Sequence, residues 1–233
     1  MTTLSAITAA IHSIIQDDSY ITEYTDRIND AVSNIAGGVR MPDGTTSPPL
    51  PDLYTSAIIS TTTNAYADLP ADYQRGLFYV VDSSGDRILP PCGGNYYSFM
   101  LFLNHCYKRD LTEIGSVTKV CVKGKKFYYQ GIPGTPEDLT IMFYKIPDIL
   151  VDGGDEPEGI PDHLQIRLIK HYVCKEIFGE GLEDGAEARG VGTRYHTDKF
   201  YSAMIDLIDF IGVDAEPEYY ALSDTLSDCQ IGY

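Results

Sequence analysis

Basic residues are scarce in this sequence, and their scarcity argues against two classes of protein. The 233 residues include 17 Lys and Arg against 34 Asp and Glu, so the net charge is −17. A protein that binds DNA or RNA through the phosphates needs clustered Lys and Arg. The excess of acidic residues therefore argues against a nucleic-acid-binding protein. A peripheral protein attracted to anionic lipid needs similar clusters, so we expect no membrane partner.

Signals for secretion, membrane insertion and cross-linking are missing as well. No Lys or Arg precedes Arg27, so the first residues lack the basic region that opens a secretory signal. No apolar run reaches the roughly 20 residues that cross a bilayer. The five cysteines are widely spaced and contain no Cys-x-x-Cys pair, which predicts neither a disulfide framework nor a zinc site. We therefore expect synthesis in a reducing cytoplasm.

Motifs for catalysis and ligand binding are also absent. Gly124-Lys125-Lys126 lacks the Ser or Thr and the upstream glycine of a phosphate-binding loop. The acidic residues within 152–158 lack the alternating ligand spacing of an EF-hand. No two histidines have the spacing of a metal-binding pair, and no Gly-x-Ser-x-Gly elbow is present. We expect no enzyme, no cofactor and no metal.

Tyrosine, by contrast, is abundant: the chain has 18 Tyr and 8 Phe but no Trp. Tyrosine is enriched at protein interfaces because it joins a large apolar body to a polar tip. Tyrosines placed in strands and on helix faces explain most of these residues equally well.

Apolar residues recur at helical spacing near the N-terminus. Within 7–15 and within 21–35, apolar residues recur every three or four positions. Thr3 or Ser5 is the candidate N-cap of the first helix. Gly37-Gly38 ends the second run in the manner of a C-terminal glycine. Residues 1–53 are therefore predicted to form a helical hairpin, followed from residue 39 by a proline-rich connector without regular structure.

Residues 54–150 change to the composition of strands and predict an inserted small β-sheet domain. Gly124-Lys125 reads as a two-residue hairpin turn between two of the strands. The aromatic run 96–107 fits either a short helix or a buried strand. The expected strands are 56–63, 77–81, 119–122, 126–130 and 139–144.

Helical spacing returns in residues 151–212, which are predicted to complete a bundle with the first hairpin. Pro161 fits the first turn of a long helix. Residues 183–194 are expected to form a loop, after which Thr197 caps a second helix that Gly212 ends. The last segment, 213–233, has five acidic residues, no basic residue and no apolar period, and is predicted to be an extended tail. The expected fold class is therefore α+β.

One region departs from the acidic composition. Residues 108–126 hold six basic residues and two acidic ones. A basic hairpin on an acidic protein could meet an acidic surface of a neighbour or touch nucleic acid, whereas lysines that protect an exposed edge strand are at least as good an explanation. The candidate subunit or tail contacts are Lys119, Lys123, Lys125 and Lys126.

The order of hairpin, inserted sheet, hairpin and tail resembles that of head-to-tail adaptor (connector) proteins of tailed bacteriophages, above all of short-tailed phages. The resemblance spans residues 4–212, and its most specific part is Ile160-Pro161 at the start of the long helix, with 200–211 as its partner helix. The similar segments are LPADYQRGLFYV, KFYYQGIPGTPEDLTIMFYKIP, GIPDHLQIRLIKHYVCKEIFGEGLEDG and KFYSAMIDLIDFIG.

The resemblance implies a structural virion protein at the head–tail junction, made in the cytoplasm of the bacterial host. Such proteins form a homo-oligomeric ring, commonly of twelve copies, beneath the portal protein. The ring extends the DNA channel, with genomic DNA only as passing cargo, and offers a platform to a tail nozzle or tail-tube protein. By the same resemblance, the candidate portal-binding residues of the C-terminal arm are Tyr219, Tyr220, Leu222, Leu226, Ile231 and Tyr233.

Acidic walls would suit such a channel, because repulsion from phosphates keeps DNA from sticking. We therefore expect the helical bundle to face the channel. Two alternatives stay open. One is a non-virion assembly or scaffold interaction protein that remains monomeric. The other, less favoured because no local motif supports it, is an enzyme with a site assembled from distant residues such as His105, Cys106 and His171.

Overall fold

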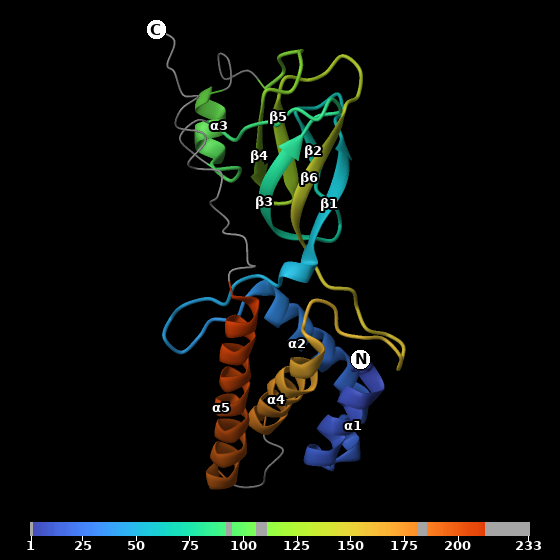
Figure 1. Ribbon diagram of the computed structural model, residues 1–233, viewed down its shortest axis with the longest axis vertical. Helices are drawn as coiled ribbons and strands as arrows, with labels where there is room; N and C mark the ends of the chain where they lie inside the picture. The colour runs from blue at the N-terminus through green and yellow to red at the C-terminus, as the bar shows by residue number, and fades with distance from the viewer. Residues whose placement is uncertain (1, 92–94, 106–110, 181–185, 213–233) are drawn as a thin grey trace. The chain divides into compact units, whose positions relative to one another are not determined.

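The computed structural model describes residues 2–91, 95–105, 111–180 and 186–212, which fall into two compact units (Figure 1). The helical unit consists of the described residues of Met1–Leu53 and Ile146–Ala215. The sheet unit consists of the described residues of Tyr54–Lys145. No described helix is long and apolar enough to cross a membrane.

The N-terminal part of the helical unit is a pair of helices joined by a short 3-10 turn. Helix α1 (Leu4–Ile15) begins after Thr3, whose side chain accepts a hydrogen bond from the backbone N–H of Ala6. The 3-10 helix η1 (Asp18–Glu23) leads into α2 (Tyr24–Gly37), which ends at Gly38 with a positive φ of 93°. The predicted helical hairpin, its Thr3 cap and its glycine end are confirmed.

Helix α4 (Asp162–Glu180) is the centre of this unit, since α1, α2 and α5 (Ala186–Ile211) all pack against it. No residue of α4 is among the exposed large apolar side chains of the described residues. Arg27 of α2 also binds Glu180 of α4, with 2.6 Å between guanidinium nitrogen and carboxylate oxygen. The buried residues of α4 and α5 include Leu168, Ile169, Val173, Cys174, Ile177, Phe200, Ala203, Met204 and Leu207.

The predicted start of the last helix was wrong. The sequence suggested a loop up to residue 194 and a cap at Thr197, but α5 is already helical at Ala186. Glycine inside a helix costs about 1 kcal/mol relative to alanine, and two glycines favoured the loop. Packing outweighs that cost, because His196 stacks on Phe178 of α4 at a centroid distance of 5.2 Å.

The proline-rich connector also contains more structure than expected. It includes a short 3-10 helix, η2 (Pro51–Leu53), and a bridge between Arg40 and Thr46. Leu50 and Leu53 are buried in the helical unit, so the connector contributes to the core rather than only linking two parts. The prediction of no regular structure over residues 39–53 was therefore wrong at these points.

The sheet unit contains two antiparallel sheets of three strands each, with strand orders β1-β6-β3 and β2-β5-β4. Residues from both sheets meet in one apolar core that includes Val80, Val120, Phe127 and Ile141. The strands are β1 (Tyr54–Ser60), β2 (Tyr66–Asp68), β3 (Tyr73–Val81), β4 (Lys119–Lys123), β5 (Lys126–Gln130) and β6 (Asp138–Lys145).

Most features predicted for the sheet unit are present. Strands β4 and β5 pair as the expected hairpin around Gly124, whose φ is 61°. The ambiguous run 96–107 forms a helix, α3 (Phe99–His105), rather than a strand. Strand β2 was not anticipated, because three residues among polar neighbours carry no period of their own. The α+β class is confirmed.

Candidate interaction surfaces

The lysines of the β4–β5 hairpin lie on the side of the sheet that faces away from the core. Side chains alternate along a strand, so the burial of Val120, Val122 and Phe127 on one side directs Lys119, Lys123 and Lys126 to the other. Lys125 lies in the exposed turn between the strands. Residues Tyr66, Tyr128 and Cys121 are opposite one another in the register and share the lysine side.

Aromatic rings and two of the lysines form a row on this side. Tyr128 lies between Tyr66 and Phe99 of α3, at centroid distances of 5.8 Å and 4.9 Å. The Lys126 ammonium lies 4.7 Å from the Tyr66 ring centre, and the Lys123 ammonium lies 4.4 Å from that of Phe99. These two lysines therefore have partners within the sheet unit through cation–π contacts.

Lys126 has an ionic partner as well. Its Nζ lies 2.6 Å from a carboxylate oxygen of Asp68 on β2. The hydrogen bond to Asp68 raises the pKa of the Lys126 ammonium, so the lysine remains charged. Lys119 and Lys123 lie on β4, an outer strand of this sheet, as the edge-protection explanation requires, whereas Lys126 lies on the central strand β5 and bridges to β2. The contact role proposed for Lys119, Lys123, Lys125 and Lys126 stays a prediction.

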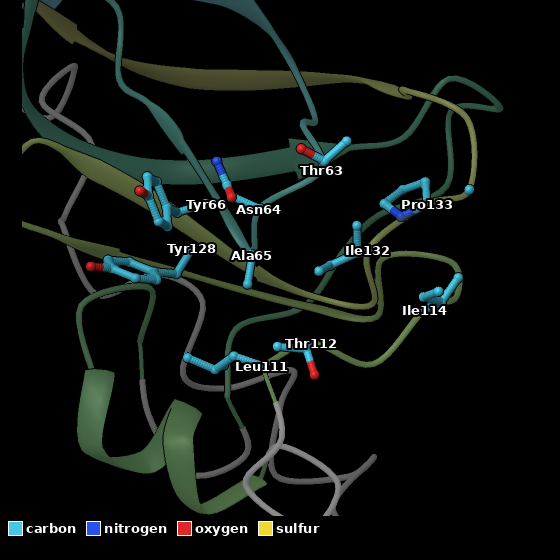
Figure 2. A pocket seen from close by; sticks show the side chains of 11 residues that line it. Thr63, Asn64, Ala65, Tyr66, Leu111, Thr112, Ile114, Tyr128, Ile132 and Pro133 are labelled. Carbon is cyan, nitrogen blue, oxygen red and sulfur yellow. The ribbon is translucent and has the colours of Figure 1, made fainter.

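An apolar pocket opens beside the aromatic row (Figure 2). Its volume is about 610 Å³, and Figure 2 shows Tyr66 and Tyr128 at one end, with Ile114, Ile132 and Pro133 toward the other. Apart from the two tyrosines, none of its lining side chains is ionisable. Its lining residues are Thr63, Asn64, Ala65, Tyr66, Leu111, Thr112, Ile114, Tyr128, Ile132, Pro133 and Gly134. The pocket therefore has the character of a recess for apolar groups.

The helical unit contains a buried histidine pair between α4 and α5. The Nδ1 atoms of His171 and His196 are 2.8 Å apart, so one ring donates the hydrogen bond and the other accepts it. Burial, helped by repulsion from His196 and nearby cations, lowers the pKa of His171 to about 4. Burial also lowers the pKa of His196. The pair is therefore neutral at pH 7 and acts as a polar link in an apolar interface.

This pair was missed by sequence reasoning, and the mistaken start of α5 explains why. His196 was assigned to the residues before a cap, so no helix partner for His171 was sought. His163, eight residues before His171 on α4, also contacts α5: its ring centre lies 5.1 Å from that of Phe210, and the ring centres of His171 and His196 are 5.1 Å apart.

Neither unit gathers a recognisable catalytic or metal-binding group among its described residues. No cluster of three or more His, Cys, Asp or Glu side chains suits a metal ion within that part of the chain. Burial raises the pKa of the Cys174 thiol to about 12, which makes it a poor nucleophile. The suggested combination of His105, Cys106 and His171 stays untested, because Cys106 and the His105 side chain lie outside the described residues.

The candidate arm residues also lie outside the described part of the chain. They are Tyr219, Tyr220, Leu222, Leu226, Ile231 and Tyr233.

A family model described as SU10 adaptor protein matches residues 1–224, which is nearly the whole chain and covers both units. The chain therefore belongs to the SU10 adaptor protein family and is a phage head–tail adaptor. Membership indicates a structural protein rather than an enzyme, and a place in the virion. No curated protein matched the sequence.

Proposed function

We propose that this adaptor forms a ring between the portal and the tail of a short-tailed phage. The ring extends the DNA channel and gives the tail its attachment platform. Its partners are the portal protein, a nozzle or tail-tube protein, and neighbouring copies, with twelve copies in the ring. The observation that carries the proposal is the family match over both units.

The distribution of charge supports a division of tasks between the two units. Residues 1–53 and 146–212 hold 21 acidic and 8 basic residues, whereas residues 54–145 hold 8 acidic and 9 basic ones. A surface that DNA must slide past needs to repel phosphates, which suits the helical unit. The nearly neutral sheet unit suits contacts with proteins, through its lysine side and its apolar pocket.

The segment 213–233 is the proposed portal-binding arm. It carries five acidic residues and no basic one, with the apolar anchors Tyr219, Tyr220, Leu222, Leu226, Ile231 and Tyr233 spaced along it. A segment with scattered anchors can wrap a large surface and order on contact. Lys119, Lys123, Lys125 and Lys126 are the proposed contacts to the tail or to a neighbouring copy.

Co-sedimentation with portal rings from the same genome tests this function. The purified full chain should sediment with the portal, and electron microscopy should show a ring of added density on it. A chain ending at Gly212 should bind far less, while a full chain with Ile58→Ser, a change at an exposed position of the sheet unit, should bind normally. Failure of the full chain to bind at low salt would favour the non-virion assembly factor.

A further inference from the structure

An acidic groove lies on the helical unit between α2 and the segment that follows β6. It has a volume of about 400 Å³ and combines the carboxylates of Asp26, Asp30 and Asp148 with the apolar side chains of Ile146 and Ile149. Neither Asp26 nor Asp30 forms an ion pair within the described part of the chain. The groove therefore offers negative charge beside exposed hydrocarbon.

The geometry of one asparagine explains why the apolar wall of the groove is exposed. The side-chain amide of Asn29 donates to the carbonyl of Leu150 at 3.0 Å, and its oxygen accepts from the Leu150 N–H at 2.8 Å. These bonds hold Leu150 against α2, where it is buried. Its neighbours Ile149 and Val151 are each 73% exposed. Ile149 and Val151 therefore add exposed apolar surface beside the carboxylates of the groove.

A surface of complementary character lies on α5. Its inner side buries His196 and Phe200, so residues about half a turn away point outward. There Val191 is 72% exposed and Tyr195 53% exposed, with Arg194 and Lys199 beside them. We call the four residues Val191, Arg194, Tyr195 and Lys199 the outer α5 face.

The two cations of the outer α5 face differ from three other cations of the helical unit. Arg27, Arg167 and Lys175 are each bound to a carboxylate of the same unit. Arg194 and Lys199 form no ion pair within the described residues, although Lys199 lies 5.7 Å from the ring centre of Tyr195. Their charges are therefore available to a partner.

We propose that the acidic groove of one copy binds the outer α5 face of a second copy. Arg194 and Lys199 then lie opposite Asp26 and Asp30, and the Val191 and Tyr195 side chains pack on Ile149 and Val151. This inference rests on the proposed ring, because it supplies the contact by which neighbouring copies join.

The placement of the two surfaces favours a head-to-tail contact. Figure 1 shows α5 on one side of α4 and the gold segment after β6 on the other. A contact between different surfaces on opposite sides repeats from copy to copy and closes into a ring when the rotation allows. A stable interface buries ~800 Å² per partner, whereas this contact joins one groove to four side chains of one helix face. Free copies should therefore associate weakly until the portal holds them together.

Charge exchange tests the pairing. One variant carries Asp26→Arg and Asp30→Arg, so that both of its surfaces are basic; the other carries Arg194→Asp and Lys199→Asp, so that both are acidic. Each variant alone should leave about tenfold fewer copies on portal rings than the wild-type chain, because like charges then meet at every contact. An equal mixture of the two should restore the wild-type number, because the variants can alternate around a ring.

Asp18→Arg combined with Asp52→Arg is the matched control, since it changes net charge equally at exposed positions outside the groove. It should bind as the wild type does. If each charge-exchange variant binds normally alone, or if the mixture fails while the control binds, the proposed pairing is wrong even though the adaptor function stands.

A second measurement does not depend on the portal. A carbodiimide joins carboxylates to amines that touch, so concentrated wild-type protein, mixed from two isotope-labelled batches, should give peptides linking Lys199 of one batch to Asp26 or Asp30 of the other. If wild-type chain fails to bind the portal, these peptides still support the pairing while the ring function fails. Their absence at concentrations where other links between copies form would overturn the pairing.

Discussion

The helical unit and the sheet unit differ in charge, although they belong to one chain. The helical unit carries 21 acidic and 8 basic residues in its two segments, while the sheet unit is almost neutral, with 8 acidic and 9 basic ones. The overall net charge of −17 therefore describes neither part well. A single net charge would suggest one uniformly acidic surface, whereas only the helical unit is strongly acidic.

The units also differ in how their cores are built. In the helical unit, one central helix gathers the other three around it, largely through contacts along α4. In the sheet unit, alternation along β4 and β5 separates an apolar core side from a side with lysines and aromatic rings. If this division extends to stability, each unit should unfold by itself.

Removing one buried ring from each core should show whether the units unfold separately. Phe200→Ala in α5 and Phe127→Ala in β5 each empty a site that is at most 1% exposed. Each should cost about 3–5 kcal/mol in the free energy of unfolding of its own unit. Calorimetry should then show one lowered transition per variant. Equal lowering of every transition by both variants would mean that the chain unfolds as a single cooperative body.

A glycine at the end of β5 should be the next most sensitive position. Gly131 has a φ of +86°, and an added Cβ would lie 2.1 Å from the carbonyl oxygen of Ser116. Gly131→Ala should therefore destabilise the sheet unit by about 2–3 kcal/mol in chemical denaturation. Gly85→Ala is the matched control: its φ is +88°, but nothing lies near the added atom, so it should cost only about 1 kcal/mol. Equal losses would contradict the clash.

Acid should weaken the helical unit through its histidine pair. The pKa of His171 is lowered to about 4, so the folded state disfavours its protonation. In the unfolded chain a histidine has a pKa near 6.5. Above that pH the neutral His171 ring makes its full contribution to the free energy of unfolding, and this contribution is lost as the pH falls toward 4. Between pH 7.5 and 4.5 the wild-type chain should lose about 2 kcal/mol more than His171→Asn, which cannot titrate.

His163→Asn, at an exposed position of the same helix, is the control for that comparison. It should follow the wild-type pH dependence, since His163 is not part of the buried pair. If His171→Asn shows the same pH dependence as the wild type, the pair does not set the acid sensitivity of this unit.

The smallest effect is expected from the lysine side. Lys126→Ala removes an exposed ion pair with Asp68 and a contact with Tyr66. Exposed pairs contribute little, so the melting temperature should fall by no more than about 1 °C. Lys125→Ala, in the turn, should leave it unchanged. A large loss for Lys126→Ala would show that the lysine is needed for folding of the sheet unit rather than for binding.

The sequence predicted this architecture well where the signals were local. Helix ends at Gly38 and Gly212 and the turn at Gly124 were recognised because each needs a glycine with positive φ or an end to helical spacing. The start of α5 was misplaced because packing of His196 on α4 outweighs two helix-weakening glycines. Strand β2 was missed because its pairing with β5 is a contact between residues distant in sequence.

The candidate surfaces, too, could be predicted only where the signal lies within one segment of the sequence. The lysines of the hairpin were identified from composition, because alternation alone sets the side on which they lie. The apolar pocket and the acidic groove could not be predicted, since each joins separate segments: Tyr66, Ile114 and Ile132 in the first, Asp30 and Ile149 in the second. Only the folded chain brings such residues together.

The central claim is that this adaptor is a ring component between the portal and the tail. Cryo-electron microscopy of the head–tail junction in purified particles tests it most directly. The account predicts a ring of density between portal and tail into which the α4–α5 pair of the helical unit fits once per copy, with its acidic surface toward the channel. Particles whose junction contains no density for this helix pair would contradict the claim.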